Sequence, residues 1–212
     1  ADGICHVYID KDADLNKALN VTFDSKTQYV AVCNAAETLL VHESVANDFL
    51  PLMKKKFDEK GVQLFGCEKT LKIIDVLPAN EKTWKNEYLD YKMSVKVVCC
   101  IDKAIEHINQ FGSGHTETII TEDSKSAAKF MSLCDSGNVF WNCSTRFSDG
   151  FRYGLGAEVG ISTNKIHARG PVGLEGLLIY KWLAKGTGNI VADYSSGNKV
   201  FTHKKLDKNF EI

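Results

Sequence analysis

Cys33 is the side chain in this sequence best suited to covalent chemistry. It lies in the string YVAVCNAAETLLVH, among small and apolar neighbours. A thiolate on a loop can attack an electrophilic carbon if its pKa is lowered. The alternative is that Cys33 packs as a small buried apolar group, which is the usual role of a cysteine. The wider sequence must decide between these two interpretations.

The other cysteines favour packing over chemistry. The chain has seven cysteines, an odd number spread widely, unlike the dense and even framework of a small secreted protein. A reducing compartment is therefore expected. Cys99 and Cys100 fall within a predicted strand, where they should point to opposite faces and only pack. No spacing of cysteine and histidine matches a zinc site, so we expect no metal.

The charge pattern disfavours several classes of partner. The formal net charge is −1, and the charges of both signs are interspersed. No basic face indicates nucleic acid or an anionic membrane as a partner. No apolar run reaches the roughly 18 residues of a membrane span, and the amino terminus lacks a signal pattern. A small-molecule substrate fits better.

The elements that must position Cys33 alternate between strand and helix patterns. Near Cys33 we expect a strand over 4–9, a helix over 13–24, a loop over 25–36, a strand over 38–42 and a helix over 42–60 that ends at Gly61. Further along we expect strands over 71–76, 94–100 and 117–121, and helices over 101–111 and 123–133. This alternation predicts an α/β fold with a parallel sheet flanked by helices.

The character of the chain changes after Val139. Residues 150–176 are rich in glycine and should be mostly loop, and residues 174–183 resemble a strand or short helix that docks on another domain or subunit. We therefore expect a catalytic domain over 1–170, and an oligomerisation strand with a polar tail over 171–212.

Three long strings in this order resemble the γ-glutamyl phosphate reductases, of the aldehyde dehydrogenase superfamily. They are the Cys33 string, GSGHTETIITED over 112–123, and STRFSDGFRYGLGAEVGISTNKIHARGPVGLEGLL over 144–178. The opening ADGICHVYIDKDADLNKA is also similar. The string WNCSTRFSDG and the length of the tail are most similar to those in the reductase half of the bifunctional animal Δ1-pyrroline-5-carboxylate synthase.

This resemblance implies an aldehyde dehydrogenase-like catalytic domain and a reaction of proline biosynthesis. L-glutamyl 5-phosphate would be reduced by NADPH to glutamate 5-semialdehyde and phosphate. Cys33 would attack the acyl carbon and form a thioester that hydride then reduces. The Cys33 amide and Asn34 would stabilise the oxyanion.

The resemblance also implies residues that bind substrate and cofactor. Arg146 and Arg169 would hold phosphate and carboxylate groups, although each could instead form a surface or interdomain salt bridge. Glu87 would hold the nicotinamide ribose. The other expected substrate ligands are Asn142, Ser144, Thr145, His115 and His167, with the reservation that such histidines more often brace a loop.

Some positions depart from the family pattern. Val30 and Val32 replace the usual proline and alanine, and Asn164 with Lys165 replaces a serine and arginine pair, which puts the fine substrate preference in doubt. The glycines of 150–176 would shape the mouth of the site, or merely supply turns.

The chain has no glycine-rich turn that would cradle a dinucleotide phosphate ahead of a helix. We therefore expect an upstream nucleotide-binding domain outside this chain, without which the isolated chain would be inactive. The location would be intracellular: mitochondrial for the animal enzyme and cytoplasmic otherwise. A homo-oligomer is expected. Two alternatives are another enzyme of the superfamily and a non-catalytic assembly partner that docks through 171–182.

Overall fold

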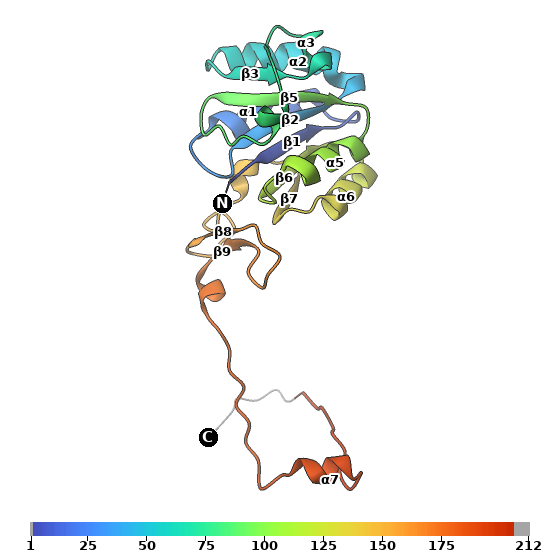
Figure 1. Cartoon of the computed structure of the whole chain (residues 1–212), viewed down its shortest axis with the longest axis vertical. Helices are drawn as coiled ribbons and strands as arrows, with labels where there is room; N and C mark the ends of the chain where they lie inside the picture. Colours follow the sequence, from blue (N-terminus) through green and yellow to red (C-terminus); the bar gives the residue numbers. More distant parts are fainter. Residues whose placement is uncertain (1, 206–212) are drawn as a thin grey trace. The chain divides into compact units, whose positions relative to one another are not determined.

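A computed structural model describes residues 2–205 of the chain (Figure 1). It divides into two compact units, Ala1–Leu177 and Leu178–Ile212. The first unit contains all the strands and all but one of the helices in the described part of the chain. The second contains the short helix α7 (Val191–Ser195) and otherwise no regular element between 178 and 205.

The first unit is built on a seven-stranded sheet in which every pairing is parallel. The strand order is β4-β3-β5-β2-β1-β6-β7, so β1 lies near the middle. The strands are β1 (Cys5–Ile9), β2 (Ala36–His42), β3 (Gln63–Gly66), β4 (Leu77–Pro78), β5 (Lys92–Val98), β6 (Thr116–Ile120) and β7 (Asn138–Trp141). The predicted α/β class with a parallel sheet is confirmed.

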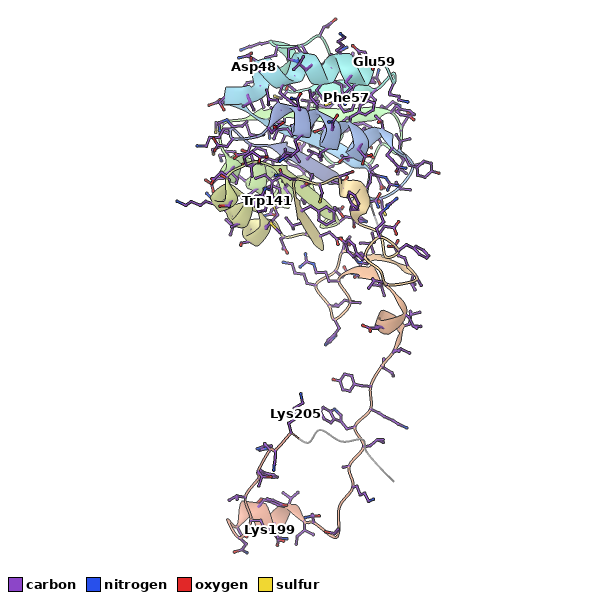
Figure 2. All side chains as sticks on the ribbon, turned by 180° about the vertical axis from the view of Figure 1, so that it is seen from behind. Asp48, Phe57, Glu59, Trp141, Lys199 and Lys205 are labelled. Atoms are coloured by element: carbon purple, nitrogen blue, oxygen red, sulfur yellow. The ribbon has the colours of Figure 1, made fainter. Side chains whose placement is uncertain are left out.

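Helices cover both faces of this sheet, because alternate residues of the central strands point to opposite sides. Val7 and Leu39 pack into the core beneath α1 (Leu15–Thr27) and α2 (Glu43–Asp58). Tyr8 and Leu40 pack beneath α5 (Ile101–Phe111) and α6 (Ser124–Leu133). Figure 1 shows the α5 and α6 side, and Figure 2 shows α1 and α2 from behind, with Phe57 labelled near the end of α2. The predicted helix over 101–111 is confirmed to the residue.

The short elements complete the first unit. They are α3 (Glu68–Leu71), α4 (Glu81–Trp84), the 3-10 turns η1 (Thr145–Phe147) and η2 (Leu174–Leu177), and the antiparallel pair β8 (Gly160–Ser162) and β9 (Gly170–Val172). Within residues 2–205, no helix combines the length and apolarity needed to cross a membrane.

Three sequence-based expectations are wrong in detail. The segment 71–76 is not a strand: Leu71 ends α3, and the amides of Ile73 and Ile74 bond to the Thr70 carbonyl in a turn. Ile74 is buried in the core, so this apolar run reflects burial without strand pairing. The loop predicted from residue 25 begins later, since α1 continues to Thr27.

The third error concerns the adjacent cysteines. Strand β5 ends at Val98, so Cys99 and Cys100 follow the strand instead of lying within it. Their sulfur atoms do not point to opposite faces of the sheet but lie 3.8 Å apart. The reason is that the chain turns there into α5, for which Cys100 is the residue before the first turn.

Candidate active site

Cys33 lies on the loop that joins α1 to β2, at the amino end of that strand. Its side chain is half-buried, whereas Asn34 beside it is buried. Gly3, just before β1, packs against the Cys33 backbone so closely that a Cβ at Gly3 would clash with the Cys33 carbonyl. The nearby Cys5 thiol also donates to that carbonyl, at 3.1 Å. The segment that leads into β1 therefore holds the Cys33 backbone in place.

The neighbours of Cys33 shift the pKa of its thiol in both directions. Burial raises the pKa of the thiol, and its own backbone amide, which hydrogen-bonds to the sulfur, lowers it. The carboxylates of Glu158 and Glu87 raise the pKa further, while Arg146 lowers it. The net direction is upward, so the unliganded chain holds Cys33 mainly as the thiol.

Asn34 fastens the other side of this loop. Its Nδ2 donates to the carbonyl of Ser148 at 2.7 Å, and its carbonyl accepts from the Thr145 hydroxyl at 2.7 Å. The Asn34 Oδ1 is buried and has no hydrogen-bond partner among the described residues. Asn34 thus joins the Cys33 loop to the turn over 144–148.

Ser144 and Thr145 form hydrogen bonds within the fold. Ser144 Oγ accepts from Ser25 Oγ at 3.2 Å and from the Arg146 amide at 3.2 Å, where it caps η1. The Thr145 amide donates to Ser25 Oγ at 3.2 Å. Because both side chains are buried, they hold the η1 turn against α1 and the Cys33 loop.

Arg146 lies at the point where these elements meet. It is only 8% exposed, and its Nε donates to Oε1 of Gln28 at 2.9 Å, a neutral partner. Burial, followed by the neighbouring Arg152, lowers its pKa. A cavity of about 220 Å³ is lined by Arg146, Arg152, Gln28, Asp24 and Phe147. Two guanidinium groups beside one cavity, near a thiol, can hold an anionic group.

Glu87 also lies within electrostatic reach of the thiol. Its Oε1 accepts from the Gly3 amide at 2.8 Å, which ties it to the segment that supports Cys33. This bond leaves Oε2 of Glu87 able to accept from a ligand hydroxyl. The structure therefore brings together Cys33, Asn34, Arg146 and Glu87 among the predicted site residues.

Four other predicted residues lie outside the Cys33 loop and the η1 turn. Asn142 has a positive φ of 57° and bonds through both amide atoms to the backbone of Thr121, at the end of β6. His115 is buried, bonds through Nδ1 to Thr116 Oγ1 at 2.8 Å, and has its pKa lowered by burial to about 4. Nδ1 of His115 also lies 3.6 Å from the Cys5 sulfur, whose thiol donates to the Cys33 carbonyl. The roles of Asn142 and His115 in substrate binding stay predictions.

Arg169 and His167 line a separate cavity of about 480 Å³, formed by the β8–β9 region and the η2 turn. Nη2 of Arg169 pairs with Oδ1 of Asp135 at 3.0 Å, and Lys165 also contacts Asp135. The predicted alternative for Arg169, a salt bridge, is thus present. Its role toward substrate stays a prediction, as does that of His167.

Sequence reasoning missed several residues around the thiol. These residues reach the site only through contacts between segments that are distant in the sequence, so no local sequence pattern predicts them. They are Gly3, Gln28, Arg152 and Glu158. The buried pair of Lys26 and Glu37, 2.6 Å apart with both side chains inaccessible, flanks the Cys33 loop on either side. Burial raises the pKa of Glu37 to about 7 and lowers that of Lys26, so desolvation favours the neutral forms of the two groups.

The sequence and the fold of this chain are similar to those of known proteins. No family model matches the chain. A γ-glutamyl phosphate reductase of Acetivibrio thermocellus is 65% identical over 212 residues, which are the whole of this chain and 49% of that protein. The crystal structure of a γ-glutamyl phosphate reductase from Thermotoga maritima matches with a TM-score of 0.88 and 49% identity, over 90% of this chain and 46% of that one. The chain thus spans about half the length of the relatives it matches.

More distant structures share the fold alone. An acetylating aldehyde dehydrogenase from Geobacillus thermoglucosidasius matches with a TM-score of 0.64 and 20% identity, over 89% of this chain and 52% of that one. A glyceraldehyde-3-phosphate dehydrogenase from Methanocaldococcus jannaschii, complexed with NADP, matches with a TM-score of 0.53 and 20% identity, over 68% of this chain and 40% of that one. The fold is therefore that of aldehyde dehydrogenases. The expected likeness to the animal enzyme and a mitochondrial location gain no support from these bacterial and archaeal proteins.

Proposed function

Because the chain is homologous over its full length to part of the γ-glutamyl phosphate reductases, we propose that it is the cysteine-bearing portion of such an enzyme. The reaction is the reduction of L-glutamyl 5-phosphate to glutamate 5-semialdehyde and phosphate, a step of proline biosynthesis. The observation that carries the proposal is the half-exposed Cys33 thiol, held between Gly3 and the η1 turn that presents Arg146.

In this proposal the sulfur of Cys33 attacks the acyl carbon of the substrate. The S–C bond forms, the C–O bond to phosphate breaks, and a thioester remains on the enzyme. Since the unliganded thiol keeps its proton, that proton passes to the phosphate oxygen released when the C–O bond breaks, and the phosphate leaves as its dianion, HPO4²⁻. Arg146 and Arg152 hold the departing phosphate, and the Cys33 amide donates to the developing oxyanion.

When bound, NADPH would supply the hydride that reduces the thioester, and a structural relative of this fold is complexed with NADP. The free Oε2 of Glu87 fits a ribose hydroxyl, which is the one contact to the cofactor proposed for this chain. The rest of the cofactor site belongs to a portion of the enzyme outside this chain. The location we propose is intracellular, in a reducing compartment.

Ser144, Thr145 and Asn34 act on the reaction mainly by position. Their hydrogen bonds fix the η1 turn and the Cys33 loop relative to each other. Arg169, His167, His115 and Asn142 remain proposed substrate ligands in the complete enzyme. The segment 171–212 is proposed as an oligomerisation segment, and a role of the chain as a non-catalytic assembly partner is the second candidate function, favoured by the apolar side chains exposed there.

The test of the proposed function is Cys33→Ala in the complete enzyme. We expect glutamyl phosphate reduction to fall by at least about a thousandfold, because no thioester can form. The matched control is Cys143→Ala, which removes another half-buried thiol whose pKa is likewise raised by burial.

Two outcomes would count against this assignment. A Cys33→Ala enzyme that keeps near-normal reduction would remove the nucleophile. Turnover of simple aldehydes in preference to glutamyl phosphate would instead point to another enzyme of the superfamily.

A further inference from the structure

Cys99 and Cys100 place two thiol sulfurs side by side at the junction of β5 and α5. The two Sγ atoms are 3.8 Å apart. Cys99 is exposed and Cys100 is half-buried. Although Cys100 occupies the position before α5, its side chain makes no capping bond to the helix. Among the described residues, the two sulfurs contact each other, and the Cys99 sulfur otherwise accepts only from its own backbone amide.

The separation of the sulfurs fits chelation better than a disulfide. A disulfide needs the sulfurs about 2.05 Å apart and is strained between neighbouring residues. Two sulfurs that each lie about 2.3 Å from a shared tetrahedral centre are about 3.8 Å apart. The pair can therefore bind one soft atom without rearrangement of the backbone.

The surroundings can stabilise the charge of a bound dithiolate. Cys99 lines a cavity of about 360 Å³ whose other charged lining residues are three lysines and one carboxylate, namely Lys69, Lys96, Lys103 and Glu106. The pKa of Lys103 is raised chiefly by Glu106 and further by the negative charge of the Cys99 and Cys100 thiolates, which places its ammonium within electrostatic reach of both sulfurs. Lysine ammonium groups beside the pair can balance the negative charge of a bound dithiolate.

We propose that Cys99 and Cys100 form a two-thiol chelating site for a thiophilic metalloid or soft metal ion. The site lies at the carboxyl end of β5, whereas Cys33 precedes the amino end of β2, which pairs with β5 in parallel. The two thiol sites therefore lie near opposite ends of these two neighbouring strands. This inference is independent of the proposed reductase function.

Phenylarsine oxide is the probe, because its arsenic forms bonds to two thiols at once. Two As–S bonds form, the arsenic-bound oxygen leaves as water with the two thiol protons, and no electron is transferred. We expect the reduced 212-residue chain to bind one equivalent, with Cys99 and Cys100 protected together from iodoacetamide in peptide mass spectra.

The variants Cys99→Ser and Cys100→Ser should each weaken binding by about a hundredfold or more, since only one sulfur remains to bind arsenic. Cys67→Ser and Cys143→Ser, which remove single half-buried thiols, are the matched controls and should bind like the unsubstituted chain. A small dithiol should strip the arsenical where the same concentration of monothiol does not. Unchanged binding by either of the first two variants, or protection that maps to other cysteines, would overturn the proposal. Far-UV circular dichroism of each variant separates loss of the site from loss of the fold.

Discussion

At the scale of single residues, the charge state of Cys33 depends on a few opposed neighbours. Burial, Glu158 and Glu87 keep the proton on sulfur, while the local amide and Arg146 favour the thiolate. Glu158 comes from the glycine-rich loop, where its Oε2 accepts from the Gly150 amide at 2.6 Å. The loop therefore influences the thiol electrostatically as well as shaping the surface near it.

This balance predicts opposite effects of two substitutions on Cys33 reactivity. Alkylation requires the thiolate, so a raised pKa slows it at neutral pH and the rate rises as pH increases. Glu158→Gln removes a negative charge, lowers the pKa and should speed alkylation at pH 7 by about two- to fivefold, a modest effect because Glu158 is exposed to solvent. Arg146→Gln should slow it by a similar factor.

The measurement is the pH dependence of iodoacetamide labelling at Cys33, followed by peptide mass spectrometry of the full chain. Glu175→Gln is the control, since this exposed carboxylate is not among the groups that perturb the Cys33 thiol. Rates that move together in the two variants, or not at all, would show that the named charges do not govern the thiol.

At the scale of elements, the Cys33 loop is held by segments far away in the sequence. The start of β1 supports it through Gly3, and the η1 turn joins it through Asn34 and Thr145. A buried ion pair joins the two ends of the loop, because Lys26 lies near the end of α1 and Glu37 lies in β2. Four separate elements therefore help to place one side chain.

Gly3→Ala tests the support from β1. The added methyl group would meet the Cys33 backbone, which must shift, so we expect a loss of about 1–3 kcal/mol in unfolding free energy and an altered rate of Cys33 alkylation. Urea denaturation and labelling measure the two effects. Gly160→Ala is the matched control, because nothing lies within 4 Å of its would-be Cβ. If both variants behave alike, close packing at Gly3 is not what places the loop.

The elements also show what the sequence could reveal. Helix α5 was predicted to the residue, because its apolar positions repeat at helical spacing and Gly112 follows its last residue. The apolar run over 71–76 misled, since burial in a turn and burial in a strand give similar patterns. Cys33 and Arg146 were found through family-like strings, whereas Gly3 and Glu158 reach the site only through tertiary contacts.

At the scale of the whole molecule, the second unit exposes unusually apolar side chains. Ile179 is 98% exposed and Trp182 is 88% exposed, and Leu177 and Leu178 at the unit boundary are also exposed. Such a contiguous apolar stretch is typical of an interface surface. It is the basis for proposing that this segment joins subunits.

Ile179→Asp combined with Trp182→Ser should shift the complete enzyme toward smaller species, because charge and lost apolar area oppose association. Light scattering coupled to size exclusion measures the mass. The matched control is Leu52→Asp, which charges an exposed apolar position outside the proposed oligomerisation segment. An unchanged mass in the double variant, at dilutions where subunits can exchange, would exclude this segment as the contact.

The place of β1 in the sheet has a consequence for how the molecule forms. The strand pairs with β2 on one side and with β6 on the other, and the bond from the His6 amide to Glu117 spans 111 positions. During synthesis on the ribosome, β1 emerges long before β6, so one of its edges waits unpaired. Long-range parallel pairing of this kind forms slowly and leaves unpaired backbone groups and apolar side chains exposed to wrong partners. A nascent chain of this protein should therefore depend on chaperones until β6 has left the exit tunnel.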